Sequence, residues 1–347
     1  MAGIKDVARQ AGVSPTTISR YLNNHLELPE ATRSRIDAAI EQLGYRPNLL
    51  AKRLSTGKAE IIGVVAPEIA NPFFTNLVAA IEDEAERHGY SVLLSSTRGM
   101  RTREIEQISR LGDRHVDGLI LMTNKPDDGT LAAFIEKHAN IVLLDEDVPG
   151  FSGPRIFVEN AEGAYQATRF LIEAGHRRIA HIGGPADLMS TIERQSGFMR
   201  AMGEAGLEPT HILLGSYTSE FGVAAMKDIL DSPERPTGLF AGSDFVAIGA
   251  MQHIGERGLR VPDDISLVGF DDMPFAGLLA PPLTTIRQPV QELGRKAFQA
   301  LFAVMNEQPL PDLGRLPTTL VERQSVARRP WTITTPVLGR KPSVKPC

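Results

Sequence analysis

At 347 residues, with 42% hydrophobic and 23% charged residues, the chain has the composition of a soluble globular protein of two or three domains. No apolar run approaches the roughly 18 residues that span a bilayer, and the amino terminus lacks the regions of a secretory signal, which predicts a cytoplasmic protein without membrane contact. The single cysteine, Cys347, excludes an internal disulfide, a thiolate metal cluster and a cysteine nucleophile.

The formal net charge of −5 is divided unevenly along the chain. Residues 1–58 hold 9 Lys and Arg against 5 Asp and Glu, a charge of +4, which leaves −9 for the remainder. A basic segment ahead of an acidic body is typical of a nucleic-acid-binding segment, although so small an excess also arises by chance.

The first 46 residues predict three short helices around one small core. In IKDVARQA, residues 4–11, apolar side chains recur at helical spacing, and Gly12 follows as a stop. Ser14 and Pro15 then begin a second helix as N-cap and first helical residue, and a third helix is expected over about residues 29–43. Two helices joined by so tight a turn predict a helix-turn-helix.

The second of these helices would enter the major groove of DNA with its amino-terminal residues against the base edges. Arginine pairs with guanine through two hydrogen bonds, while threonine offers a hydroxyl to phosphate or base and a methyl group to thymine. Serine and threonine at this end also hold phosphates, which set the register without reading the sequence. The candidate DNA-binding residues here are Ser14, Pro15, Thr16, Thr17, Ser19 and Arg20.

The run IKDVARQAGVSPTTISRYLN and the following ATRSRIDAAIEQLGYRPNLLAKRLSTGK closely resemble the head of the lactose-repressor (LacI/GalR) family of bacterial regulators. In that family the stretch after the proline forms a hinge helix on operator DNA, and a leucine from each subunit enters between base steps. About two turns are too short to be helical alone, so the hinge should fold on DNA beside its partner. The resemblance implies that the hinge residues on DNA are Asn48, Lys52, Arg53 and Leu54, with the leucine as the wedge.

From Ile61 onward, strand-like apolar runs alternate with amphipathic helical patterns. Repeated βα units predict parallel sheets with helices on both faces, and the strands are too many for one comfortable sheet. The run breaks near residues 159–161. The expected fold class is therefore a small all-α helix-turn-helix head followed by an α/β body of two doubly wound parallel-sheet subdomains.

Polar and aromatic side chains follow several of the predicted strands. Ligands of open parallel sheets lie outside the carboxyl ends of the strands, and carboxylates, amides and aromatic rings together suit a small polyhydroxylated molecule. Asp244 and Asp272 can equally serve as helix N-caps. The candidates read from the strand ends are Asn71, Phe73, Phe74, Asp145, Ser243, Asp244, Asp271, Asp272 and Gln288.

The family resemblance continues through the body, in runs such as GLRVPDDISLVGFDD and PPLTTIRQP. The body also looks like the periplasmic sugar-binding proteins, whose two lobes close on a ligand. Ser243 stands where asparagine is usual and Glu146 where arginine is common, which leaves the ligand's identity open. The resemblance implies an effector site lined by Asn71, Phe74, Asp145, Arg194, Tyr217, Asp244, Asp271 and Gln288.

The expected domains follow from these boundaries. They are a helix-turn-helix head over residues 1–46, a hinge over 47–60, an effector-binding and dimerisation domain over 61–330, and a disordered tail over 331–347. The first lobe takes residues 61–160 with 289–320, and the second takes 161–288 with 321–330. The tail has no leucine heptad, so we expect no coiled-coil tetramer.

The sequence predicts a binding protein and not an enzyme, because it contains no phosphate-binding loop, GxGxxG, GxSxG or HExxH pattern. His176 and His181 suit packing better than metal ligation. We expect a dimeric repressor without cofactor or metal that binds a palindromic operator and responds to a sugar or polyol, because buried carboxylates disfavour an anionic ligand. A purine- or nucleoside-responsive repressor of the same family and a sugar-binding receptor remain as alternatives.

Overall fold

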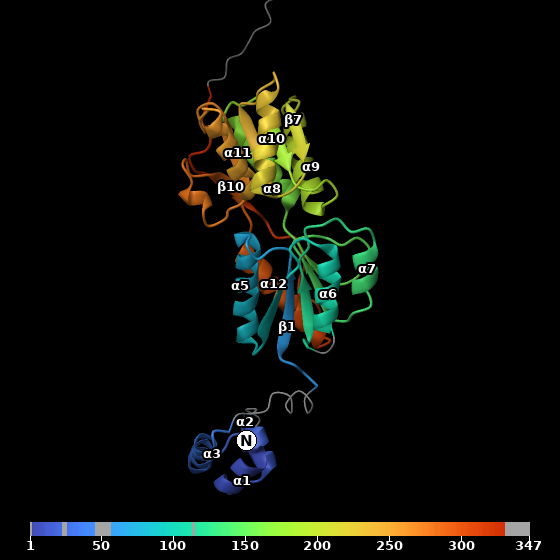
Figure 1. Cartoon of the computed structure of the whole chain (residues 1–347), viewed down its shortest axis with the longest axis vertical. Helices are drawn as coiled ribbons and strands as arrows, with labels where there is room; N and C mark the ends of the chain where they lie inside the picture. Colours follow the sequence, from blue (N-terminus) through green and yellow to red (C-terminus); the bar gives the residue numbers. More distant parts are fainter. Residues whose placement is uncertain (1, 23–25, 46–56, 113–114, 330–347) are drawn as a thin grey trace, which may run out of the picture. The chain divides into compact units, whose positions relative to one another are not determined.

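The computed structural model describes residues 2–22, 26–45, 57–112 and 115–329. Its contacts divide the chain into a head, Met1–Ala59, and a body, Glu60–Cys347, which Figure 1 colours along the sequence. Outside the described residues lie the predicted tail, residues 331–347, and the predicted DNA contacts of the hinge, Asn48, Lys52, Arg53 and Leu54. The roles of these segments stay predictions.

In its described residues the head contains three helices: α1 (Ile4–Ala11), α2 (Pro15–Leu22) and α3 (Glu30–Leu43). Gly12 and Gly44 end the first and third with left-handed φ of 67° and 57°, a backbone that glycine adopts without strain. The Ser14 hydroxyl accepts the Thr17 amide at 3.0 Å, as an N-cap does. The predicted helix-turn-helix is confirmed. Its buried core consists of Val7, Ala8, Ala11, Ile18, Ile36 and Ala39.

The first lobe of the body is a five-stranded sheet in the order β2-β1-β3-β4-β5, with every pairing parallel. In Figure 1 helices α5 and α12 lie on one side of it and α6 and α7 on the other. Val142 and Leu144 pack toward α5 and α12, while Ile141 and Leu143 pack toward α6 and α7, the alternation of a strand buried on both faces. The elements are β1 (Ile61–Ala66), α5 (Pro72–Arg87), β2 (Ser91–Ser96), α6 (Arg101–Gly112), β3 (Gly118–Leu121), α7 (Thr130–Ile135), β4 (Ile141–Leu144), β5 (Arg155–Ile156) and α12 (Val290–Met305).

The second lobe is a six-stranded sheet in the order β11-β10-β9-β8-β6-β7, parallel except where β11 runs antiparallel to β10. Phe240 and Phe270 pack toward α8 and α9, whereas Leu239 and Leu267 pack toward α10 and α11. Helices therefore cover both faces, as predicted. The elements are α8 (Asn160–Glu173), β6 (Ile179–Gly183), α9 (Met189–Glu204), β7 (His211–Leu214), α10 (Ser219–Asp231), β8 (Gly238–Ala241), α11 (Asp244–Glu256), β9 (Ser266–Asp271), β10 (Thr284–Arg287) and β11 (Thr319–Val321).

The chain passes between the two lobes at three places: after β5, after β10 and ahead of β11. At the first and third of these, Val158 and Leu316 form a parallel bridge. Because β11 pairs with β10, the last segment belongs to the second lobe from Thr319, and not from residue 321 as the sequence pattern placed it. Residues far apart in sequence thus meet between the lobes.

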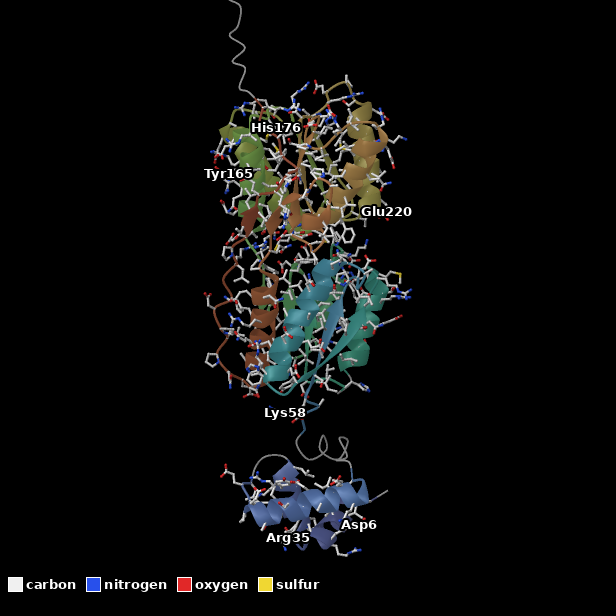
Figure 2. The ribbon with its side chains drawn as sticks, turned by 90° about the vertical axis from the view of Figure 1, so that its left-hand side faces the viewer. Asp6, Arg35, Lys58, Tyr165, His176 and Glu220 are labelled. Carbon is white, nitrogen blue, oxygen red and sulfur yellow. The ribbon has the colours of Figure 1, made fainter. Side chains whose placement is uncertain are left out.

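His176 and His181 are packing residues of the second lobe, and Figure 2 labels His176. The His176 ring nitrogens contact the Thr237 hydroxyl at 3.0 Å and the Ala327 carbonyl at 3.1 Å. Burial lowers the pKa of both histidines to about 4, so both are neutral near pH 7. Over the described ranges, no cluster of three metal-ligating side chains occurs and no helix is long and apolar enough to span a membrane.

A close helix contact in the second lobe gives a test of the fold. A Cβ on Gly197 of α9 would lie 1.9 Å from the carbonyl oxygen of Ala161 on α8, so Gly197→Ala must separate the helices. We expect it to lower the free energy of unfolding by about 1 to 3 kcal/mol, the usual cost of overpacking. Urea unfolding of the purified chain, followed by circular dichroism, measures the change.

Gly203 on the same helix is the matched control, because a Cβ there meets nothing within 4 Å. Gly203→Ala should leave stability unchanged or raise it by up to about 1 kcal/mol through helix propensity. Equal midpoints for the two variants would contradict the close packing of α8 and α9.

Candidate functional site

The amino-terminal end of α2 forms an exposed polar face on the head. Ser14, Pro15, Thr16 and Arg20 are exposed, while Thr17 and Ser19 are half-buried. The hydroxyls of Ser14 and Thr17 lie 2.8 Å apart. The same two residues therefore cap the helix and present hydroxyl groups at its exposed end. Within the described residues Arg20 has no acidic partner, which leaves its guanidinium available to DNA.

A cleft of about 550 Å³ opens in the body, with walls from both lobes. Asn71 and Phe74 line it from the first lobe and Tyr217 from the second. Asn71 also caps α5, since its Oδ1 accepts the Phe73 amide at 2.9 Å. Phe73 does not line the cleft; its ring packs in the lobe's core, edge-on to Phe74 at 5.3 Å. Three of the predicted effector residues therefore share one cleft.

Arg194 is a buried guanidinium behind the Tyr217 wall of this cleft. Its Nε donates to Asn160 Oδ1 at 2.9 Å and one terminal nitrogen donates to the Gly242 carbonyl at 2.6 Å. The guanidinium carbon lies 3.8 Å from the centroid of the Phe270 ring and 5.4 Å from that of Tyr217. Hydrogen bonds and two aromatic rings therefore fix its position.

Three carboxyl groups lie close enough to Arg194 for their charges to interact with its guanidinium. Burial raises the pKa of Asp145 well above its ordinary range, that of Glu146 to about 7 and that of Asp271 to about 6, and in each case the Arg194 charge acts in the opposite direction. Asp145 and Asp271 also have left-handed φ of 77° and 118°. Strained backbone beside perturbed acids is typical of a ligand site.

Asp244 and its neighbour divide the roles that the sequence left open. Ser243 is the N-cap of α11, accepting the Val246 amide at 3.2 Å. Asp244 is fully buried, and its two oxygens accept the Thr285 hydroxyl at 2.6 Å and the Met273 amide at 2.8 Å. Its carboxyl braces the loop after β9, so a direct ligand contact stays a prediction.

Asp271 and Gln288 line a second opening of about 640 Å³, between the end of the β9 and β10 strands and helices α5 and α12. Gln288 donates to Asp271 Oδ1 at 2.7 Å, and its own buried Oε1 has no hydrogen-bond partner among the described residues. Asp272 beside them is paired with Arg287 and Arg323, both at 2.6 Å. Of the predicted effector residues, Asn71, Phe74 and Tyr217 therefore line the first opening and Asp271 and Gln288 the second. The remaining four line neither opening: Phe73, Asp145, Arg194 and Asp244.

Two polar contacts join the lobes next to these openings. The Ser190 amide of the second lobe donates to Glu146 Oε2 of the first at 3.2 Å. Arg315, on the strand-like segment that returns to the second lobe, pairs with Glu193 at 2.6 Å. Glu146, noted in the sequence only as a departure from a common arginine, therefore has a role in lobe contact.

Three cations of the cleft wall escaped the sequence analysis: Arg98, Arg103 and Lys125. Arg98 and Lys125 come shortly after β2 and β3, so the strand-end rule that selected Asn71 and Asp145 would have found them too. Only carboxylates, amides and aromatic rings were taken as candidate ligand groups, so these cations were not among them.

Residues 3–48 match the family described as "Bacterial regulatory proteins, lacI family", and residues 168–326 match the periplasmic binding protein-like domain. The HTH-type transcriptional repressor PurR of Escherichia coli is 36% identical over 336 residues, which cover 95% of this chain and 98% of that protein. The likeness thus extends from the head through both lobes.

Two solved structures agree with this result. The lac repressor dimer bound to operator and the anti-inducer ONPF superposes with a TM-score of 0.84 at 29% identity, covering 94% of this chain and 99% of that one. The complex of the transcriptional regulator CelR with cellobiose gives 0.70 at 31% identity, covering 94% and 100%. These matches confirm the predicted fold class and place the chain among cytoplasmic DNA-binding transcriptional repressors and not among enzymes. The chain belongs to the lacI family of bacterial regulatory proteins.

Proposed function

We propose that the chain represses transcription as a dimer on a palindromic operator and that a small effector between its lobes controls the repression. The observation that carries this proposal is the exposed end of α2, where Thr16 and Arg20 stand clear of the head's core. The solved lac repressor, itself a dimer bound to operator, supports it. Two-fold symmetry in a protein matches the two half-sites of a palindrome.

The effector is proposed to be a purine or nucleoside, which the sequence analysis held as an alternative to a sugar. Support comes from the likeness to PurR along 95% of this chain. The sugar interpretation keeps one specific observation in its favour, the similarity to a repressor solved with cellobiose. The rings of Phe74 and Tyr217 suit either class, since an aromatic wall stacks on a nucleobase and covers the C–H face of a sugar.

Effector control requires a ligand that binds two lobe arrangements with different affinity, with a typical coupling of ~1 to 3 kcal/mol. The contacts that join the lobes, Glu146 with Ser190 and Glu193 with Arg315, are the ones that a change in closure would break or remake. The cleft lies beside them, so ligand occupancy and lobe contact are expected to be linked. The sign of the linkage is left to experiment.

Arg20→Ala tests the DNA-binding face. We expect the full chain to lose roughly 1 to 3 kcal/mol of specific affinity, about five- to 150-fold, because a guanidinium that pairs with a base edge has no substitute. Fluorescence anisotropy measures it, using a duplex selected by the wild-type chain from a randomised palindromic library. Arg9→Ala, which removes an exposed cation from α1, is the matched control and should have a much smaller effect. Equal losses would assign Arg20 a general electrostatic role only.

A thermal-shift panel of purines, nucleosides, pentoses, hexoses and polyols tests the effector class. A ligand at ~100 times its Kd adds about 2.7 kcal/mol of stability, which is easily detected. Phe74→Leu should weaken the binding of any ligand found, because Phe74 lines the cleft. Phe73→Leu on the same helix should lower stability without changing the ligand's Kd. Similar Kd changes in both variants would contradict a ligand against Phe74, and hits confined to sugars would overturn the purine proposal.

Glu146→Gln tests the buried acid between the lobes. A carboxyl whose pKa rises on folding, here from an ordinary 4.5 to about 7, stabilises the fold fully below the lower value and loses that contribution as pH rises through the upper one. Glutamine does not titrate, so the Tm of the variant relative to wild type should rise between about pH 5 and pH 8. Differential scanning calorimetry measures it. Glu106→Gln, an exposed acid on α6, should show no such trend; a flat difference for Glu146→Gln would contradict the raised pKa.

A further inference from the structure

The first-lobe wall of the 550 Å³ cleft carries an excess of positive charge. Arg98 lies in the loop after β2, Arg103 in the first turn of α6, and Lys125 in the loop after β3. Among the described residues, Glu68 is the one acid that lines the cleft. This gives a formal lining charge of +2 in a body whose charge is −9, so the cations are concentrated where a ligand binds.

Arg101, a fourth cation next to the same wall, has a structural role instead of lining the cleft. Its guanidinium pairs with the fully buried Glu104 at 2.5 Å and donates to the carbonyls of Lys125 and Pro126 at 3.1 and 2.7 Å. Glu104 in turn accepts the Thr123 hydroxyl at 2.6 Å. Arg101 therefore holds the loop that carries Lys125 against α6, which presents that lysine from a fixed backbone.

The side chains of Arg98, Arg103 and Lys125 take part in none of these bonds. Within the described residues none of the three forms an ion pair, although each lines the cleft. Two guanidinium forks and one ammonium group make a set that suits an oxyanion with several acceptor oxygens. An unpaired triad in a ligand cleft is difficult to explain by packing, since exposed cations of no function are usually scattered.

We propose that Arg98, Arg103 and Lys125 form a subsite for an acidic group of the effector, and that a phosphomonoester is the group that fits. A phosphate monoester carries about −1.5 to −2 charges near pH 7, which balances the lining charge. This inference rests on the proposed effector role of the cleft and narrows its ligand to a phosphorylated one, such as a nucleotide or a sugar phosphate.

The buried carboxyl groups do not conflict with a phosphate subsite on the three cations. Asp145, Glu146 and Asp271 are grouped around Arg194 behind the Tyr217 wall and do not line this cleft, whereas the three cations line its first-lobe wall. An extended ligand can place its phosphate on the cations and its hydrogen-bond donors toward the carboxyls. The expectation that this cleft prefers a neutral ligand took account of the acidic end alone.

The test begins with inorganic phosphate on the full chain at constant ionic strength, using the thermal shift. Wild type should show saturable stabilisation with a Kd on the order of millimolar, and the triple variant Arg98→Gln, Arg103→Gln, Lys125→Gln should lose it. Lys137→Gln, an exposed lysine of the same lobe outside the cleft, should respond as wild type does. The result is read from the difference between wild type and variants, because phosphate also stabilises proteins weakly by being excluded from their surface. An equal response in wild type and triple variant overturns the subsite.

Paired ligands complete the test by calorimetry: inosine with inosine monophosphate, and ribose with ribose 5-phosphate. In the pair that binds, the phosphorylated member should bind at least about tenfold tighter, and the triple variant should abolish that preference while keeping the affinity for the neutral member. A neutral member that binds as tightly as its phosphate overturns the inference.

Operator binding separates the two proposals. If a neutral member alters operator affinity and phosphate does not bind the triad, the effector role stands and the phosphate subsite falls. If phosphate binds the triad but no member of either pair alters operator affinity, the subsite stands as a binding site and the effector role of these compounds falls.

Discussion

The arrangement of the body depends on Arg194, the cation that the buried acids share. Its guanidinium donates to Asn160 at the start of α8 and to Gly242 after β8, and it lies on the Phe270 ring of β9. One planar group thus contacts the start of a helix and the ends of two strands. The acids around it would repel one another without it, because a buried carboxylate that loses its only counter-charge costs several kcal/mol. A site that buries several carboxyl groups away from water needs a cation such as Arg194 among them. Arg194 also contacts the Tyr217 ring that forms the cleft wall.

That centre lies near the contacts that join the lobes, and this proximity gives the fold a means of regulation. Glu146 accepts a hydrogen bond from Ser190 across the lobes while it belongs to the acid group of Arg194. A ligand that changes the charge or hydration of the group changes the same carboxyl that holds the lobes together. Coupling through one shared residue needs no long pathway, since each event alters the free energy of the other directly.

The sequence predicted most reliably what neighbouring residues decide. Gly12 and Ser14 set helix ends through local backbone geometry, so the helix-turn-helix was readable from the chain alone. The strands β5 and β11 were not, because segments of two or three residues are too short to show a period. The surroundings of each side chain were harder still to predict. Phe73 and Phe74 are adjacent, alike and both buried in the lobe's core, yet of the two only Phe74 also lines the cleft. Ser243, and not Asp244, proved to be the cap, which depends on tertiary partners such as Thr285 that a local pattern does not contain.

The cleft is basic on one wall and lies near a group of buried acids behind the other. This difference in charge limits which ligands can bind and in which orientation. The first-lobe wall presents Arg98, Arg103 and Lys125, while the other end presents Tyr217, behind which Arg194 gathers Asp145 and Glu146 of the first lobe and Asp271 of the second. A ligand with donors at one end and an acidic group at the other can satisfy both walls in one orientation only. Such a ligand contacts both lobes through different chemistry, so its full affinity is realised only when the lobes are at the right separation. A neutral molecule that meets the second lobe alone gains nothing from closure. The same charges that select the ligand would therefore also make its binding depend on lobe position, which is the condition for an effector.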